Sequence, residues 1–244
     1  MWFNKLLNKI SDQFFQCFIE DNRWKYFTNG LLVTLEVTFF ALLIGLAIGV
    51  VVAVIRSSYD QNKDELKPGL GRFLFKVANG ISKFYLTVIR GTPVVVQLLI
   101  GYFVVFMSSN NTVLVASIIF GVNSGAYITE IFRGGIMSID KGQFEAGRSL
   151  GFNYIQTMQY IIIPQAFKNV LPALCNEFIA LLKETAVCGY IGLMDLTKGG
   201  DVVRGRTFIP LMPLLAVALV YLGLVTIMSN LVGKLERRLR NSGH

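Results

Sequence analysis

Long runs without a charged residue dominate the hydrophobic pattern of this 244-residue chain. Residues 37–55, with a lead-in from Gly30, predict a first membrane-spanning helix, because about 20 apolar residues suffice to cross a bilayer. The uncharged run 91–129 is long enough for two further spans, with a polar turn at 108–111 between them. Residues 207–233 predict the last span.

A weaker apolar stretch between Pro164 and Leu193 predicts a fourth span. Glu177, Lys183 and Glu184 interrupt this stretch, and charged groups at bilayer depth usually face a cavity or a partner. We therefore expect a helix with a functional interior. The pattern as a whole predicts an all-α integral membrane protein with five transmembrane helices.

The segment 70–89 is too rich in charge to be counted among these spans. Four basic residues punctuate it and its end: Arg72, Lys76, Lys83 and Arg90. We expect a helix that lies along the membrane and leads into the next span. A sixth span here would invert half of the topology.

Three divisions of the chain follow from the same pattern. In residues 1–27 the apolar positions recur at helical spacing between charged ones, which predicts an amphipathic helix in the membrane interface. A soluble packing helix is the alternative for this segment. Residues 28–233 form the membrane domain, and residues 234–244 form a basic cytoplasmic tail.

The composition supports a membrane protein. Hydrophobic residues make up 53% of the chain and charged residues 16%, with a mean hydropathy of +0.56. An average soluble domain carries roughly 25% charge, so a soluble enzyme and a disordered chain are both excluded. The single histidine is His244, and the three cysteines share no metal-ligand spacing. We therefore expect neither a metal site nor histidine-based catalysis.

The basic residues indicate the orientation of the spans. Fifteen of the 23 fall in the loops 56–90 and 133–168 and in the tail 234–240. Lys and Arg accumulate in cytoplasmic loops, so five spans place the N-terminus outside and the C-terminus in the cytoplasm. The net charge of +8 then requires no nucleic acid partner.

The loop between the third and fourth spans has the pattern of a structured loop that docks a partner; an ordinary interface helix is the alternative. It predicts a short helix, a glycine break and a second, amphipathic helix. Two small residues in the first helix would let another surface approach closely, and two charged residues lie three apart on one helical face. The residues concerned are Glu145, Ala146, Gly147, Arg148, Gly151 and Pro164.

Polar residues inside the predicted spans form stripes at helical spacing, which we interpret as the wall of a substrate path. These residues are Gln97, Asn123, Ser124, Tyr127, Asn176 and Glu177. Glu177 is the candidate to meet an ammonium group of the substrate; alternatively it pairs with a lysine or caps backbone freed by Pro172. Lys183 and Glu184 are gate or interface residues, or they form ion pairs between subunits.

Two motifs carry a resemblance to a known family. The run from Glu145 to Gly151, followed by Ile161-Ile-Ile-Pro164, resembles the EAA loop of ABC importer permeases. Gly147 replaces the usual alanine there, and Ile163 replaces the usual leucine. The segment Arg90-Gly91-Thr92-Pro93 resembles the signature of the polar amino acid branch, which includes importers of histidine, glutamate, glutamine, arginine and opines.

The resemblance implies the type I importer permease fold with a cytoplasmic coupling helix in a bacterial plasma membrane. It also implies a second permease subunit, identical or homologous, two copies of an ATP-binding subunit and an extracellular solute-binding protein. The substrate would be a polar L-amino acid. The chain has no G-x-x-x-x-G-K-[ST] motif, so we expect no cofactor on this chain, with ATP and Mg²⁺ on the partner.

Three other readings remain to be compared with this one. A related permease could import another small solute, and the Arg90–Pro93 segment argues against that. A secondary amino acid transporter could use Glu177 as a proton carrier, which predicts uptake that survives ATP depletion. A membrane enzyme would need a cluster of catalytic side chains that the sequence does not contain.

Overall fold

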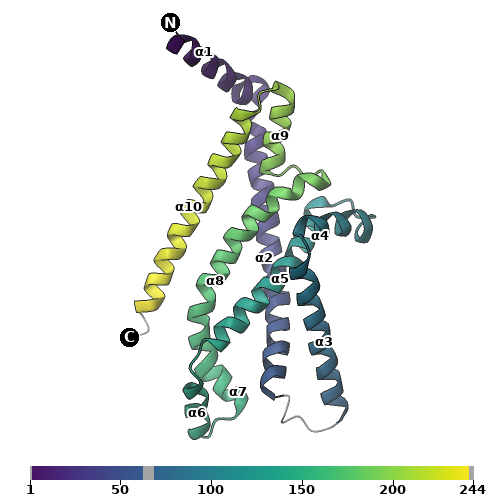
Figure 1. The fold of residues 1–244 in the computed structure, drawn as a ribbon, viewed down its shortest axis with the longest axis vertical. Coiled ribbons are helices and arrows are strands. Elements are labelled where there is room, and N and C mark those ends of the chain that lie inside the picture. The colour runs from purple at the N-terminus through teal and green to yellow at the C-terminus, as the bar shows by residue number, and fades with distance from the viewer. Residues whose placement is uncertain (1, 63–68, 242–244) are drawn as a thin grey trace.

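The computed structural model describes residues 2–62 and 69–241, which are helical throughout most of their length and contain no strand (Figure 1). The long helices are α2 (Trp24–Asn62), α3 (Leu70–Gly91), α5 (Thr112–Met137), α8 (Ile163–Glu184) and α10 (Leu211–Asn241). The shorter ones are α1 (Trp2–Phe14), α4 (Val94–Ile100), α6 (Lys141–Ser149), α7 (Tyr154–Thr157) and α9 (Leu196–Thr207). Five short π- or 3₁₀-helical pieces occur between them in the described residues: η1 (Phe15–Ile19), η2 (Glu20–Asn22), η3 (Gly101–Val105), η4 (Met158–Ile162) and η5 (Thr185–Ile191).

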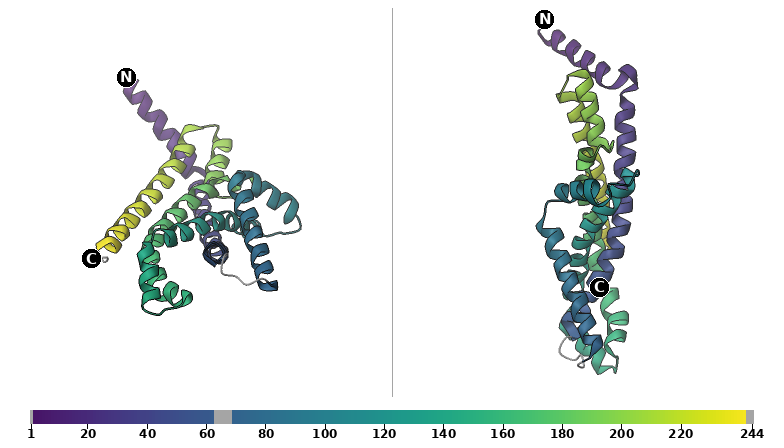
Figure 2. Two further views of the ribbon diagram at one scale, coloured as in Figure 1. Left: turned by 60° about the horizontal axis from the view of Figure 1, so that its bottom comes forward. Right: turned by 90° about the vertical axis from the view of Figure 1, so that its right-hand side faces the viewer.

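The long helices alternate in direction along the long axis of the molecule. In Figure 1, α2 runs down from α1, α3 returns beside it, α5 descends, α8 rises and α10 descends. The helices α1 and α9 therefore lie at one end, and α6 and α7 lie at the other. Figure 2 shows α3 and α10 on opposite sides of the pair formed by α5 and α8.

Three helices are long and apolar enough to cross a membrane by themselves among the residues described: Trp24–Asp60, Thr112–Met137 and Leu211–Leu239. The bent pair of α3 with Val94–Val105 is a fourth candidate. The polar helix α8 does not satisfy this test, although it runs alongside the others. The last helix, α10, continues to Asn241 and so includes most of the predicted basic tail 234–244.

Two expectations for the second span are wrong. The uncharged run after Gly91 does not hold two spans, because Val94–Val105 is short and bends 108° away from α3. The segment 70–89 does not lie across the bundle, because α3 packs antiparallel beside α2 (Figure 1). The side chain of Arg56 hydrogen-bonds to Asn79 across this pair, with a distance of 2.6 Å between Nη1 and Oδ1.

The distribution of side chains around α3 explains why the sequence did not predict its position beside α2. Its buried residues, Asn79, Ser82 and Leu86, form one edge, and large apolar side chains such as Phe84 form an exposed edge. The basic residues occupy a stripe between these edges. Hydropathy averaged over a window measures composition and does not register that the charges are confined to one side.

Glycines bring α2 and α5 into close contact. A Cβ atom on Gly49 would lie 2.5 Å from the Cγ2 of Ile128, and one on Gly121 would lie 2.6 Å from the Cβ of Ile44. Gly45 approaches the backbone of Gly125 in the same way. The Gly45–Gly49 pair is therefore a helix-packing face, as small residues four apart predict.

Two hydrophobic clusters hold the rest of the bundle. One joins α2, α4, α5, α8 and η5 around Phe120 and Leu181, which are fully buried. The other joins η1, α2, α9 and α10 around Leu196 and Val203. Beyond this second cluster α1 extends away from the bundle, with Leu7, Ile10 and Phe14 exposed (Figure 1).

Candidate functional site

The segment Arg90–Pro93 forms the sharp bend between α3 and α4. Pro93 has no backbone N–H and Thr92 has an extended backbone, so the helix cannot continue through them. The Thr92 hydroxyl donates to the carbonyl of Val88 at 2.8 Å and so closes the end of α3. The signature residues thus fix the direction in which the chain leaves α3.

Gln97 fastens this bend to α5. Its Nε2 donates to the carbonyl of Ile89 at 2.8 Å and to the hydroxyl of Thr92 at 2.8 Å. Its Oε1 accepts from Nδ2 of Asn123 at 2.9 Å. Asn123 is buried, and its Oδ1 has no hydrogen-bond partner in the part of the chain that the structure describes.

Ser124 and Glu177 connect α5 with α8. The Ser124 hydroxyl donates to Oε1 of Glu177 at 2.7 Å. Ser124 is buried and Glu177 is half-buried, while the neighbouring Asn176 is exposed. Of the polar residues predicted on α5 and α8, the structure therefore brings Ser124 and Glu177 into contact, and Glu177 is partly exposed.

One turn further along α5, Tyr127 lies beside the signature arginine. Tyr127 is 37% exposed, and the guanidinium carbon of Arg90 is 5.8 Å from the centre of its ring. Nη1 of Arg90 is 3.7 Å from Oε1 of Glu130. We refer to the surface of α3, α4, α5 and α8 formed by the following residues as the polar face: Arg90, Gln97, Asn123, Ser124, Tyr127, Glu130, Asn176 and Glu177.

A chain of ion pairs continues from the polar face toward the end of α2. Arg133 lies 3.7 Å from Glu130 and 3.0 Å from Asp60, and Asp60 lies 3.7 Å from Arg56. The sequence analysis did not identify these pairs. The i,i+4 spacing of Arg56 and Asp60 and the i,i+3 spacing of Glu130 and Arg133 were the available signals.

Lys183 and Glu184 stand apart from the polar face, at the end of α8 where η5 begins. Lys183 is exposed and Glu184 is half-buried. No group of three or more His, Cys, Asp or Glu side chains that could hold a metal ion occurs in the described ranges.

Local capping explains the shape of the loop between α5 and α8. Asp140 caps α6 through the N–H of Gly142, and Asn153 forms a capping box with Gln156 at α7. Gly151 has φ +82°, a left-handed conformation that a glycine adopts without strain. The N–H of Phe152 donates to the carbonyl of Gly147 at 3.0 Å, which completes the end of α6.

Gly147 packs inward and lets α6 contact α7. A Cβ atom on Gly147 would lie 2.7 Å from Cγ2 of Thr157 and 3.2 Å from Cδ1 of Ile161. Its neighbour Ala146 is exposed. The small residue expected to admit a partner at 147 therefore admits a helix of the same chain.

Hydrogen bonds tie this loop to two of the long helices, α8 and α2. Gln165 on α8 donates to Gln143 on α6 at 3.2 Å. Asn169 on α8 donates to Ser138 at the end of α5 at 2.8 Å. The Tyr154 hydroxyl bonds to a side chain of α2, and burial raises the pKa of Tyr154 above its usual value, while this bond opposes the shift. We refer to residues 138–165 as the coupling loop, after the role that the resemblance implies for them.

The coupling loop encloses a cleft of about 410 Å³ against the end of α5. Ile136, Met137, Ile139 and Phe144 are among its apolar lining residues, and Lys141, Glu145 and Arg148 provide charge. Glu145 and Arg148 are both exposed. Gly151 and Pro164 are not among the lining residues, because one ends α6 and the other begins α8.

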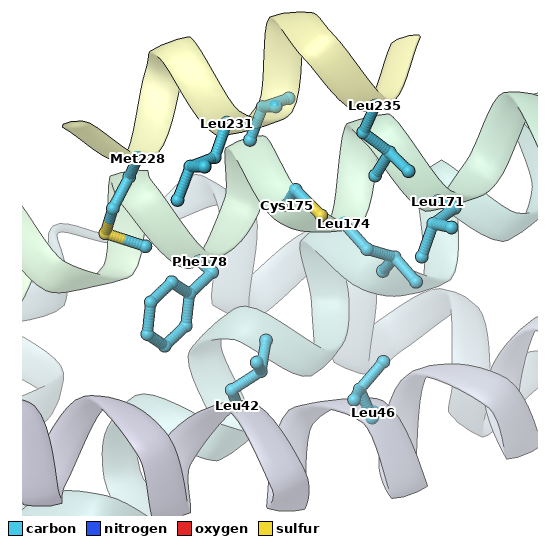
Figure 3. Close-up of a pocket in the computed structure, with 10 residues that line it drawn as sticks. Leu42, Leu46, Leu171, Leu174, Cys175, Phe178, Met228, Leu231 and Leu235 are labelled. Atoms are coloured by element: carbon cyan, nitrogen blue, oxygen red, sulfur yellow. The ribbon is translucent and has the colours of Figure 1, made fainter. Parts of the chain in front are cut away.

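The side of α8 that faces α10 is apolar, unlike the side that carries Glu177. Figure 3 shows an apolar groove of about 470 Å³ between α2, α8 and α10. Leu174, Cys175 and Phe178 of α8 face Met228, Leu231 and Leu235 of α10 across it. Phe178 and Glu177 are adjacent in sequence but belong to the two opposite surfaces.

Comparison with known proteins places this architecture in a family. Residues 69–241 match the family described as "Binding-protein-dependent transport system inner membrane component". The chain is 36% identical over 217 residues to a putative glutamine transport system permease protein GlnP of Rickettsia typhi, covering 88% of this chain and 93% of that one. It is 35% identical to the arginine transport system permease protein ArtQ of Bacillus subtilis, covering 89% and 94%.

Solved structures agree with the sequence comparison. The crystal structure of an amino acid ABC transporter with histidines matches with a TM-score of 0.77 and 37% identity, over 88% of this chain and 94% of that one. An inward-facing structure of the MetNI methionine ABC transporter shares the fold, with a TM-score of 0.69 at 20% identity over 91% and 99%. The chain therefore belongs to the family of inner membrane components of binding-protein-dependent transport systems.

Proposed function

We propose that this chain is the membrane subunit of an ATP-driven importer that carries a polar L-amino acid across a bacterial plasma membrane. The observation that carries the proposal is the polar face, where Ser124 and Glu177 connect two helices within an otherwise apolar bundle. Polar groups at this depth are costly unless they serve a path or a partner. The relatives named for glutamine and arginine transport support a polar amino acid as the substrate.

In this proposal five helices span the bilayer: α2, α3, α5, α8 and α10. We put the N-terminus and α9 outside, and the alternating direction of the helices would then bring the coupling loop and the C-terminus to the cytoplasmic side. The exposed apolar side chains of α1 would lie in the outer membrane interface. The end of α10 would carry its basic residues into the cytoplasm.

Two copies of an ATP-binding subunit would dock on the coupling loop. The rim charges Glu145 and Arg148 and the apolar floor of the cleft offer a mixed surface for such a contact. ATP and Mg²⁺ would be held by that partner. A second permease subunit, identical or homologous, would complete the path, and a loaded solute-binding protein would dock outside.

The mechanism is alternating access without chemistry on the substrate. Closure of the ATP-binding subunits would displace the coupling loop, and the bonds of Gln165 and Asn169 would transmit that displacement to α8 and α5. Ser124 and Glu177 sit on these same two helices, so their separation would change with the conformational state. Glu177 would meet the ammonium group of the substrate.

Reconstitution of the complete transporter tests this function. Proteoliposomes that contain this chain, its ATP-binding subunit and its binding protein should take up at least one of the twenty amino acids when ATP is supplied. Uptake should persist when a protonophore collapses the proton gradient and stop when ATP is removed. The opposite pattern would identify a secondary transporter that uses Glu177 as a proton carrier.

A further inference from the structure

The apolar groove between α2, α8 and α10 runs along the last two long helices (Figure 3). Phe178 of α8 and Met228 of α10 lie at one end, and Leu171 and Leu235 lie at the other. All ten lining residues are apolar. Leu231 is 60% exposed, so the groove is open to the surroundings of α10.

Both helices lead from the second end of the groove to a basic residue. Lys168 precedes Leu171 by three residues on α8. Arg238 follows Leu235 by three residues on α10. A spacing of three keeps each basic residue on the same side of its helix as the lining residue, one turn beyond the groove. Because α8 and α10 run in opposite directions, both positive charges lie beyond the same end (Figure 1).

The chain beyond this end of the groove is basic as a whole. Residues 234–240 contain four basic residues and one acidic residue, and they directly follow the uncharged run 207–233. The side chains of Lys168, Lys234 and Arg238 are exposed. In the proposed orientation this end meets the cytoplasmic leaflet, where anionic phospholipids attract Lys and Arg.

The length of the groove matches one leaflet of a bilayer. Lys168 and Phe178 are ten residues apart on α8, and Met228 and Arg238 are ten residues apart on α10. At a rise of 1.5 Å per residue each stretch is about 15 Å long, which is half of the roughly 30 Å of a hydrocarbon core. An occupant with its charge beside the basic residues would therefore extend its apolar part to the bilayer midplane.

The volume of the groove favours a lipid chain over a protein helix. An α-helix with a diameter of about 10 Å occupies roughly 1,200 Å³ over a length of about 15 Å. The groove holds about 470 Å³. A helix of a second permease subunit would project from it, whereas a single acyl chain is narrow enough to lie within it.

We propose that this groove binds an anionic phospholipid, with one acyl chain along α8 and α10 and the phosphate beside Lys168 and Arg238. Lipid tails are as apolar as the groove, so the two positive charges supply the preference over bulk lipid. The bound lipid connects α8, which carries Glu177, to α10. This inference goes beyond the transport function and rests only on the proposed orientation of the helices.

Quenching of tryptophan fluorescence by brominated lipids tests the site. The complex of permease and ATP-binding subunits is placed in nanodiscs of phosphatidylcholine, with Trp2→Phe and Trp24→Phe as the background variant. Phe178→Trp is the reporter in the groove, and its signal is the difference from the background. Leu219→Trp, at an exposed position of α10, reports contact with bulk lipid. Phosphatidylglycerol or phosphatidylcholine with brominated acyl chains is then titrated into each sample.

Brominated phosphatidylglycerol should quench Phe178→Trp half-maximally at a mole fraction about tenfold or more below that of brominated phosphatidylcholine. Each Lys or Arg near an anionic lipid contributes roughly fivefold to this preference. Leu219→Trp should be quenched equally by the two lipids. If Phe178→Trp does not assemble, Leu231→Trp is the reporter on the opposite wall of the groove.

Charge-neutralising variants identify the residues that bind the phosphate. In the reporter protein, Lys168→Gln and Arg238→Gln should each reduce the preference for phosphatidylglycerol about fivefold. Arg237→Gln is the matched control, because Arg237 follows Leu235 by two residues and therefore lies on the other side of α10. It removes the same charge and should leave the preference unchanged.

Three results would overturn the inference. Equal quenching of Phe178→Trp by the two brominated lipids would show bulk lipid in the groove. The absence of quenching by either would show that protein fills the groove, as a second permease subunit would. Equal losses in Arg237→Gln and Arg238→Gln would assign the preference to general surface charge. Failure of the transport function is separate, since it would appear as the absence of ATP-driven uptake in the complete system.

Discussion

The coupling loop is fastened to its surroundings at many points, whereas some groups of the polar face are only loosely paired. Caps at Asp140 and Asn153, the inward packing of Gly147 and the bonds of Gln165 fix the loop. On the polar face, by contrast, Arg90 and Glu130 approach only to 3.7 Å, and Asn123 keeps a buried acceptor without a partner in the described chain. We infer that the loop transmits motion, for which it must be rigid, and that the face exchanges partners, for which its groups must stay available.

Charge reversal on the coupling loop should have the largest effect and tests whether the loop couples the two subunits. Glu145→Arg would place a third cation beside Lys141 and Arg148 at the cleft. Mismatched charges at an interface cost several kcal/mol, so ATP-driven uptake should fall by more than about tenfold while the protein remains inserted. Uptake and ATP hydrolysis are measured together in proteoliposomes, and hydrolysis should no longer depend on uptake.

Glu236→Arg is the control for this change, because Glu236 is exposed on α10 and lies outside the coupling loop. It should leave uptake near the unmodified level. Coupled transport at the normal rate in Glu145→Arg would contradict a coupling role for the loop.

Enlarging Gly147 tests whether the loop must be rigid. Gly147→Val would force atoms into Thr157 and Ile161, where even a Cβ atom has no room. Overpacking of this kind costs about 1–3 kcal/mol, so the melting temperature and uptake should fall together. Thr157→Ala in the same chain should restore part of both, measured by thermal shift and uptake. Ala146→Val is the matched control, since Ala146 is exposed; an equal loss from that change would show that α6 does not depend on this contact.

The sequence predicts the coupling loop well and the second span poorly, for one physical reason. Gly151, Asp140 and Asn153 act through neighbouring backbone atoms, so local spacing is sufficient to place the ends of α6 and α7. The position of α3 depends on its packing against α2 and α5. In the sequence, the charges of this segment argue against a membrane span. Only the fold shows that Arg90 and Lys83 line a polar cleft.

On the polar face, too, the sequence predicts positions along one helix better than contacts between helices. Of the residues in the predicted polar stripes, Ser124 contacts Glu177, and Asn123 contacts Gln97. The role of Gln97 could not be derived, because its hydrogen bonds to Ile89 and Thr92 exist only once the chain has turned by 108°. The sequence identified Arg90 as a signature residue. The cleft that Arg90 lines forms only when α3 packs on α5, so the sequence did not predict it.

The two sides of α8 offer a smaller, sharper test of the polar face. Glu177→Gln keeps an acceptor for Ser124 but removes the charge, so uptake should fall about tenfold or change its amino acid preference. Phe178→Ala, one residue away in the apolar groove, should lower the melting temperature through lost packing and leave the preference unchanged. Competition by each of the twenty amino acids measures the preference. Unchanged uptake kinetics in Glu177→Gln would exclude Glu177 from the path.

The smallest effect concerns the pH dependence of the coupling loop. Burial raises the pKa of Tyr154 above the value of about 10 that it has in an unfolded chain. The neutral phenol therefore contributes stability that is complete below pH 10 and is lost as the pH rises through the folded-state pKa. Tyr154→Phe should flatten the fall in melting temperature of the complex between about pH 9 and 11, at the cost of the hydrogen bond at neutral pH. Tyr160→Phe, an exposed tyrosine of the same loop, should leave the pH profile as it is. If Tyr154→Phe left that profile steep, the tyrosine would not be a buried anchor of the loop to α2, and the rigidity of the loop would depend on its caps, on the packing of Gly147 and on the bonds of Gln165 and Asn169.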